Sequence, residues 1–137
     1  MLRVSFRRLA WLIPSALLLA ACGGSAGSGS APGAVEAYLQ AIITGNATQV
    51  VNLSCPAWEA DARTEAASFE SVEVSLEGLA CQEAGAEGGY TLVTCAGTIV
   101  AVYNGENQEL PLAGRTYQAS PVDGEWKMCG YLSLIHI

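Results

Sequence analysis

The region after residue 33 begins with apolar residues at helical spacing. The first stripe predicts a helix that ends at Gly45-Asn46, and its members are Val35, Tyr38, Leu39, Ile42 and Ile43. A short second helix is expected over residues 47–53. Pro56 suits the first turn of a third helix, which should continue to residue 69. The inward positions of that helix are Trp58, Ala62, Ala66 and Phe69.

Beyond residue 70 the hydrophobic period shortens from a helical turn to two residues. Apolar and polar residues alternate over residues 71–77, which predicts a strand with one wet face, and Gly78 then indicates a bulge. A loop is expected at residues 85–89. Residues 90–103 are nearly uncharged and apolar on both faces, which predicts a central strand that needs cover on each side.

Two turn signals divide the C-terminal part. Asn104-Gly105 favours a type I′ hairpin that leads into a strand over residues 108–119, where Pro111 is tolerated at an edge or an irregularity. Asp123-Gly124 predicts the next turn, before a last strand over residues 125–131. The pattern therefore predicts an α+β fold, with three helices followed by a four-stranded antiparallel meander.

The N-terminus carries the three parts of an export signal. Basic residues at positions 3, 7 and 8 precede a short apolar run over residues 9–21, which leads into the segment Leu-Ala-Ala-Cys-Gly at positions 19–23. This segment resembles the lipobox of bacterial lipoproteins, which implies a signal peptide over residues 1–21 and lipidation of Cys22. A membrane span is the competing interpretation, but the run is shorter than about 20 residues and contains Pro14.

Residues 22–33 are rich in Gly and Ser, which predicts a flexible linker between the lipidated Cys22 and a domain over residues 34–131. Two acyl chains anchor a protein durably, whereas one binds only marginally. We therefore expect a lipid-anchored, extracytoplasmic protein of the bacterial cell envelope, with the membrane as its partner through the lipid.

The charge of the chain excludes one class of partner. Beyond the signal, three basic residues stand against thirteen acidic residues, a net charge of −10. No basic patch is present for a nucleic acid, so no nucleic-acid partner is expected. The acidity fits a soluble surface rather than calcium binding, because the sequence contains no Asp-x-Asp-x-Asp-Gly loop. We expect neither a metal nor a cofactor.

With Cys22 set aside, four cysteines remain, which is an even number for an exported protein. They are Cys55, Cys81, Cys95 and Cys129. Two disulfides are expected from this number. A zinc site is the weaker interpretation, because the spacings are long and no histidine lies near the cysteines. Three connectivities are open at this point.

The C-terminal hexapeptide Leu-Ser-Leu-Ile-His-Ile, residues 132–137, looks like the translation of a transposon mosaic-end adapter used in sequencing libraries. We therefore interpret these residues as an adapter-derived artefact. An ordinary apolar strand is the competing interpretation. In either case we assign no function to His136, the single histidine.

The order of elements supports a family resemblance. The opening helix over residues 35–42, the Gly45-Asn46 break and the closing segment Asp-Gly-Glu-Trp-Lys-Met-Cys at residues 123–129 resemble the nuclear-transport-factor-2-like (NTF2-like) superfamily, and in particular small bacterial lipoproteins of that cone fold. The resemblance covers residues 33–131. It implies a curved four-stranded antiparallel sheet wrapped around the first helix, with a pocket at the open end. Such a fold carries no function by itself.

This topology also selects a disulfide connectivity. Cys81 and Cys95 flank the loop at residues 85–89 and so fall on neighbouring antiparallel strands, close enough to bond. The remaining pair, Cys55 and Cys129, would join the third helix to the last strand.

Aromatic residues suggest a binding module as the function. An apolar small-molecule ligand could enter a pocket whose candidate residues are Tyr38, Trp58, Tyr103, Tyr117 and Trp126. The competing interpretation is that these side chains simply fill the core. The alternative function is a protein-interaction or envelope-assembly module that forms a homodimer through the sheet face, because a strand that is apolar on both faces needs two covers.

Catalysis is the third alternative, since relatives of the cone fold include isomerases and dehydratases. Tyr38 faces inward and could donate to a developing oxyanion. A base is also needed, and no inward carboxylate is evident: Glu73 and Glu77 fall on the wet face of their strand, Asp61 lies on a helix surface and Asp123 lies in a turn. We therefore expect that the protein is not an enzyme.

Overall fold

The computed structural model describes residues 29–133. Its helical part comprises α1 (Ala31–Ile42), α2 (Ala47–Asn52), a single 3-10 turn η1 (Pro56–Trp58) and α3 (Glu59–Phe69). Its strands are β1 (Glu73–Glu87), β2 (Tyr90–Tyr103), β3 (Glu106–Pro111), β4 (Arg115–Val122) and β5 (Glu125–Ser133). The expected signal peptide, Cys22 and most of the adapter-like hexapeptide lie outside the described residues. Among residues 29–133, no helix is long and apolar enough to cross a membrane.

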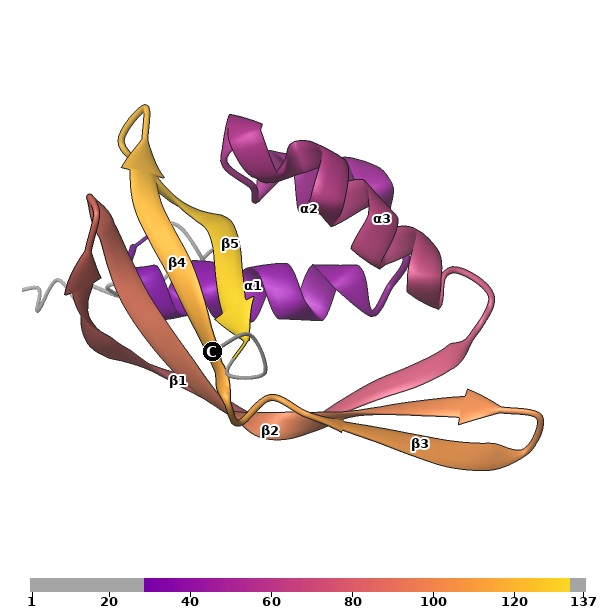
Figure 1. Cartoon of the computed structure of the whole chain (residues 1–137). Coiled ribbons are helices and arrows are strands. Elements are labelled where there is room, and N and C mark those ends of the chain that lie inside the picture. The colour runs from indigo at the N-terminus through magenta and orange to yellow at the C-terminus, as the bar shows by residue number, and fades with distance from the viewer. Residues whose placement is uncertain (1–28, 134–137) are drawn as a thin grey trace, which may run out of the picture.

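The architecture is α+β, as predicted. The helices come first, and a curled antiparallel sheet follows in the order β1-β2-β4-β5, with β3 paired to β2 beside that path. Figure 1 shows the sheet curling past α1, with α2 and α3 on the side of α1 away from the β2–β3 hairpin. This is the expected arrangement of a curved sheet around the first helix.

Helix α1 begins earlier than the sequence pattern indicates. The side chain of Ser30 accepts a hydrogen bond from the backbone N–H of Gly33 at 3.1 Å and so caps the helix. Pro32 occupies the first turn, where its missing N–H costs nothing. Ala31 is buried. The last residues of the expected linker therefore belong to the folded domain.

The sheet has five strands instead of the expected four, because the predicted strand over residues 108–119 is split. β3 pairs with residues 98–103 of β2, whereas β4 pairs with residues 91–94 of β2. Between these two stretches lies Gly97, with φ +122°, where a Cβ would stand 2.8 Å from the carbonyl oxygen of Glu77. Because β2 changes direction there, one straight partner cannot follow it, and the chain leaves the sheet after Pro111.

The predicted turns and the predicted bulge are present, with one difference in length. The register of β1 against β2 shifts between Glu77 and Ala80, at the expected bulge, and again between Glu83 and Gly85. β1 runs on to Glu87, so the expected loop at residues 85–89 shrinks to a Gly88-Gly89 turn. Asn104 and Asp123 both adopt φ +52°, as the predicted hairpin turns require.

Both expected disulfides are present. Cys81 and Cys95 face each other directly across β1 and β2, with their Cα atoms 4.1 Å apart. Cys55 and Cys129 join the start of η1 to β5. Beside this second bond, the backbone N–H of Cys55 donates to the carbonyl oxygen of Met128 at 2.8 Å, so the helical layer is also hydrogen-bonded to the sheet. Two disulfides indicate that the protein folds in an oxidising compartment.

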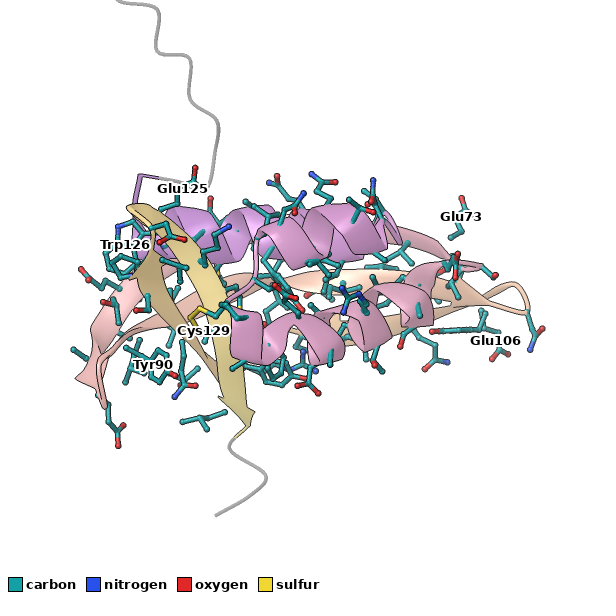
Figure 2. All side chains as sticks on the ribbon, turned by 90° about the horizontal axis from the view of Figure 1, so that it is seen from above. Glu73, Tyr90, Glu106, Glu125, Trp126 and Cys129 are labelled. Carbon is teal, nitrogen blue, oxygen red and sulfur yellow. A yellow bond between two sulfur atoms is a disulfide. The ribbon has the colours of Figure 1, made fainter. Side chains whose placement is uncertain are left out.

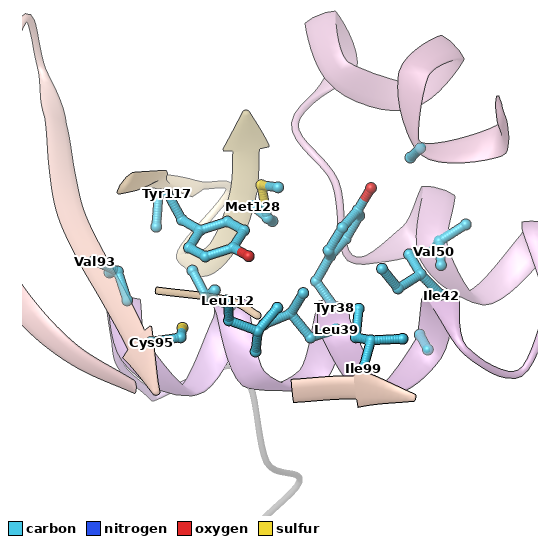
Figure 3. Close-up of a cluster of buried hydrophobic side chains, with 14 of the residues drawn as sticks. Tyr38, Leu39, Ile42, Val50, Val93, Cys95, Ile99, Leu112, Tyr117 and Met128 are labelled. Atoms are coloured by element: carbon cyan, nitrogen blue, oxygen red, sulfur yellow. The ribbon is translucent and has the colours of Figure 1, made fainter. Parts of the chain in front are cut away.

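The core lies between α1 and the inner face of the sheet (Figure 3). Its largest fully buried side chains are Tyr38, Tyr117, Leu39, Leu112, Met128, Val35, Val50 and Val93. On β2 the inner positions are buried, whereas Leu92, Val100 and Val102 on the outer face are only half-buried. The helices therefore cover one face of the central strand, and the other face is left partly open to solvent within residues 29–133.

Candidate functional site

A chain of hydrogen bonds links α1 to α3 inside the fold. Tyr38 projects from α1 toward the helical layer (Figure 3), and its hydroxyl donates to Oε2 of Glu65 at 2.7 Å. The indole Nε1–H of Trp58 donates to the same Tyr38 oxygen at 3.0 Å. Tyr38 is fully buried and Glu65 is half-buried. The phenol is therefore held in place by one acceptor and one donor.

Glu65 corrects the expectation that no carboxylate points inward. The residue lies on α3, seven positions after Trp58 and four before Phe69, and therefore on the same inward stripe. Helical spacing alone could therefore have placed Glu65 on the inward face of α3. Sequence reasoning missed the residue because a glutamate among alanines reads as a solvent-facing position. The carboxyl of Glu65 lies next to the hydroxyl of Tyr38 only because α3 packs beside α1.

Strands β4 and β5 bring three more side chains to this pair. The guanidinium of Arg115, on β4, lies 5.0 Å from the centre of the Tyr131 ring on β5. That ring also makes an edge contact with Trp58, with centroids 5.5 Å apart, and a tilted contact with Tyr117 at 5.8 Å. These residues form one group, called the polar cluster below: Tyr38, Trp58, Glu65, Arg115, Tyr117 and Tyr131.

Two members of the polar cluster have unused hydrogen-bonding capacity. The hydroxyl of Tyr117 is buried and has no partner among the described residues. Figure 3 shows it pointing into the interior toward the side of the fold where Tyr38 stands. Within residues 29–133, Arg115 forms no ion pair within 4.0 Å, whereas Lys127 pairs with Glu125. Buried polar groups without partners are rare in folded proteins, so the Tyr117 hydroxyl is an exception among the described residues.

Burial dominates the ionisation of the cluster. It raises the pKa of Glu65 above its ordinary value of 4.5, although the hydroxyls of Tyr38 and Tyr131 act in the opposite direction. Burial, and after it the charge of Glu65, raises the pKa of Tyr38 well above the usual tyrosine range. Burial raises the pKa of Tyr117 and of Tyr131 as well. The three phenols therefore remain protonated near neutral pH and can act as donors.

A cavity of about 140 Å³ opens beside the cluster. Its polar lining residues are Glu65, Ser68, Arg115 and Tyr131. Its apolar lining residues are Ile42, Phe69, Ile99 and Leu110. The space corresponds to roughly four or five water molecules, and drug-sized ligands occupy about 300–1,000 Å³. We call it the Glu65 cavity.

The structure divides the five aromatic residues expected in a pocket. Three of them, Tyr38, Trp58 and Tyr117, belong to the polar cluster, but none of the three lines the Glu65 cavity. Tyr103 lies at the β2–β3 hairpin and is 42% exposed. Trp126 lies on β5 at the end of the molecule opposite Glu106 (Figure 2), partly buried against the core. Tyr103 and Trp126 therefore do not share a site with the other three.

Two other hollows are larger but lack such a cluster. One of about 420 Å³ lies between α2 and the β4–β5 turn and contains the Glu125–Lys127 ion pair. The other, of about 410 Å³, lies where the outer face of β1 and β2 meets residues 113–115. No group of three or more His, Cys, Asp or Glu residues suited to a metal ion occurs within residues 29–133. The Glu65 cavity is the better candidate because its lining combines a half-buried carboxyl and guanidinium with several apolar side chains.

The comparisons with known proteins add little to this geometry. No protein-family model and no curated protein sequence matches the chain. A designed NTF2-like protein that carries five substitutions is similar in structure, with a TM-score of 0.43 and 15% sequence identity over 72% of this chain and 92% of that chain.

Proposed function

We propose that this chain is a lipid-anchored protein of the bacterial cell envelope whose cone-shaped domain binds a small molecule in the Glu65 cavity. The observation that supports binding is the lining of the cavity, which combines apolar side chains with a half-buried carboxyl and with a guanidinium that has no ion-pair partner within residues 29–133. The two disulfides support an oxidising location. The lipobox-like segment at positions 19–23 supports the anchor.

Native mass spectrometry tests the binding proposal. Residues 29–133 enclose one continuous core and both disulfides, so an exported form of residues 23–137 contains everything the structure describes. We expect a mass adduct that disappears on denaturation. Leu110→Trp, which enlarges a side chain in the apolar lining, should abolish the adduct. Tyr103→Trp, at the exposed hairpin tip, is the matched control and should retain it. A wild-type protein without any adduct would contradict the proposal.

Lipidation is tested on the full chain in a bacterial host. We expect the protein in the membrane fraction, with an N-terminal peptide that begins at Cys22 and carries a diacylglycerol. Cys22→Ser should release the protein from the membrane fraction. An unmodified Cys22 in a soluble protein would exclude the anchor while leaving the binding proposal intact.

A second candidate function is proton transfer, as in an isomerase or dehydratase. It is favoured by Glu65, the inward carboxyl whose pKa is raised by burial and which stands beside the phenol of Tyr38. We retain binding without catalysis as the main proposal because Oε2 of Glu65 is already occupied by the hydrogen bond from Tyr38. Incubating the recovered ligand in D₂O decides between the two. Deuterium incorporation with the wild type but not with Glu65→Gln would establish catalysis.

A further inference from the structure

The two charged groups of the Glu65 cavity have opposite signs and do not neutralise each other directly. Glu65 lies on α3 and Arg115 lies on β4, and both line the cavity. Within residues 29–133 the two side chains form no ion pair within 4.0 Å. A group bound in the cavity therefore has both the carboxyl and the guanidinium among its neighbours, and the carboxyl already accepts one hydrogen bond from Tyr38.

The charge of the occupant follows from this arrangement. A carboxylate on the ligand would gain from Arg115 but would face the carboxylate of Glu65. An ammonium group would gain from Glu65 but would face the guanidinium. Like charges at such short range in a partly desolvated site cost several kcal/mol in typical proteins. A neutral group that donates one hydrogen bond and accepts another satisfies both residues without this cost.

Two further features restrict the ligand. The apolar lining residues, which include Ile99 and Leu110, offer no hydrogen bonds from their side chains. At about 140 Å³ the cavity accommodates only a compact body.

We propose that the Glu65 cavity selects a small neutral molecule, or the neutral end of one, that carries a hydroxyl or primary amide on a compact apolar body. The polar end lies between Glu65 and Arg115, and the apolar end lies against the apolar lining residues, which include Ile99 and Leu110. This inference rests on the proposed binding function and adds the chemical class of the ligand. It excludes simple carboxylates and amines as preferred ligands.

Four probes with the same branched isobutyl body test the selection: 3-methylbutan-1-ol, isovaleramide, isovalerate and 3-methylbutylammonium. Each is titrated into isotopically labelled protein of residues 23–137 at neutral pH and followed by the NMR signals of residues around the cavity. We expect the alcohol and the amide to bind at least about tenfold more tightly than either ion, a difference of about 1.4 kcal/mol. Tightest binding of isovalerate or of 3-methylbutylammonium by the wild type would overturn the inference.

Removing one charge at a time should invert the preference. Glu65→Gln leaves Arg115 without an opposing carboxylate, so isovalerate should become the tightest of the four probes. Arg115→Gln should favour 3-methylbutylammonium in the same way. Glu106→Gln, at the exposed hairpin tip, removes one charge far from the cavity and should leave the order unchanged. If Glu65→Gln fails to fold, Arg115→Gln still tests the inference. An unchanged order in the folded cavity variants would overturn it.

The outcomes also separate this inference from the binding proposal. A native mass adduct together with no response to any of the four probes would show that a molecule binds but is not of the proposed class. Tightest binding of an ion would have the same meaning. The absence of both the adduct and any probe response would contradict the binding function and the inference together.

Discussion

Tyr38 and Leu39 are neighbours in α1, and both are fully buried, yet they belong to two different regions. Leu39 packs into the apolar core between α1 and the sheet, together with residues such as Val93 and Met128. Tyr38 points to the helical layer and takes part in the polar cluster through Glu65. Around Leu39 the core is apolar, and its packing requires no particular donor or acceptor. The cluster depends on specific donors and acceptors, and it borders the cavity.

The regions also differ in how the chain holds them together. The sheet side is joined by Cys81–Cys95, a bond between adjacent strands that closes 14 residues. The cluster joins α3 to β5, and Cys55–Cys129, which spans 74 residues, ties the start of η1, just before α3, to β5. The candidate site is therefore assembled from distant parts of the chain, whereas the sheet side is local. This difference gives four predictions.

Removing the long disulfide should have the largest effect. Chain entropy assigns about 4.5 kcal/mol of unfolding free energy to the Cys55–Cys129 closure and about 3 kcal/mol to Cys81–Cys95. In urea unfolding, the double variant Cys55→Ser/Cys129→Ser should therefore be less stable than the double variant Cys81→Ser/Cys95→Ser. It should also retain less of the native mass adduct than the other double variant, because α3 and β5 both contribute residues that line the cavity. The reverse order of stability would show that native-state strain or residual unfolded structure dominates.

Leu39→Ala should lower the unfolding free energy by about 3 kcal/mol, because it leaves a void in a closely packed apolar core. Leu110→Ala makes the same chemical change at a side chain that is 40% exposed, and we expect a loss below about 1 kcal/mol. Urea unfolding at constant pH measures both. Equal losses would mean that the β2–β3 hairpin packs in solution more tightly than its exposure indicates.

The same Tyr→Phe change should have opposite effects at two positions in the cluster. Tyr38→Phe removes the donor to Glu65 and the acceptor of Trp58, so the unfolding free energy should fall by about 2 kcal/mol. Tyr117→Phe removes a buried hydroxyl that has no partner among the described residues, so stability should be unchanged or should rise by up to about 1 kcal/mol. Destabilisation at Tyr117 would reveal a buried water or ligand atom bound to its hydroxyl.

The smallest expected effect is a pH dependence that arises from Glu65. Its pKa is raised in the folded protein, so the native state binds this proton more tightly than the unfolded chain does. Stability contributed by the protonated carboxyl is present below pH 4.5 and is lost as the pH rises through the raised native value. The wild type should therefore lose stability relative to Glu65→Gln between pH 4.5 and neutrality.

Unfolding free energies at several pH values measure this trend. Glu106→Gln, at the exposed hairpin tip, corrects for the general effect of removing one negative charge. A stability difference between wild type and Glu65→Gln that is independent of pH would mean that Glu65 is as solvated in the folded protein as in the unfolded chain.

Local patterns account for most of the fold. The stripe that includes Tyr38 and Leu39 predicted α1, and the Asn104-Gly105 and Asp123-Gly124 signals predicted their turns. These features depend on neighbouring residues, which a single sequence displays directly. The disulfides followed as soon as the strand order was assumed, because the loop places Cys81 opposite Cys95.

The features that the sequence did not reveal depend on residues that are distant along the chain. The separation of β3 from β4 follows from the close approach of Gly97 to Glu77 on another strand. The inward position of Glu65 is compatible with helical spacing, but only the packing of α3 against α1 gives the carboxyl a partner in Tyr38. Tyr103 was expected near this site, and the bend in β2 carries it to an exposed hairpin instead.

The two disulfides are nested: Cys81–Cys95 lies entirely within the loop closed by Cys55–Cys129. If the domain is oxidised while the chain is exported N-terminus first, Cys55 and Cys81 become available before Cys95 and Cys129. Pairing these four cysteines in order of appearance would give the wrong bonds. The native pair at residue 55 can close only after residue 129 has emerged. Correct maturation therefore requires that strand pairing precede oxidation, or that thiol–disulfide exchange repair the early bonds. The yield of correctly bonded protein should then depend on the disulfide-isomerase capacity of the host rather than on its oxidising power.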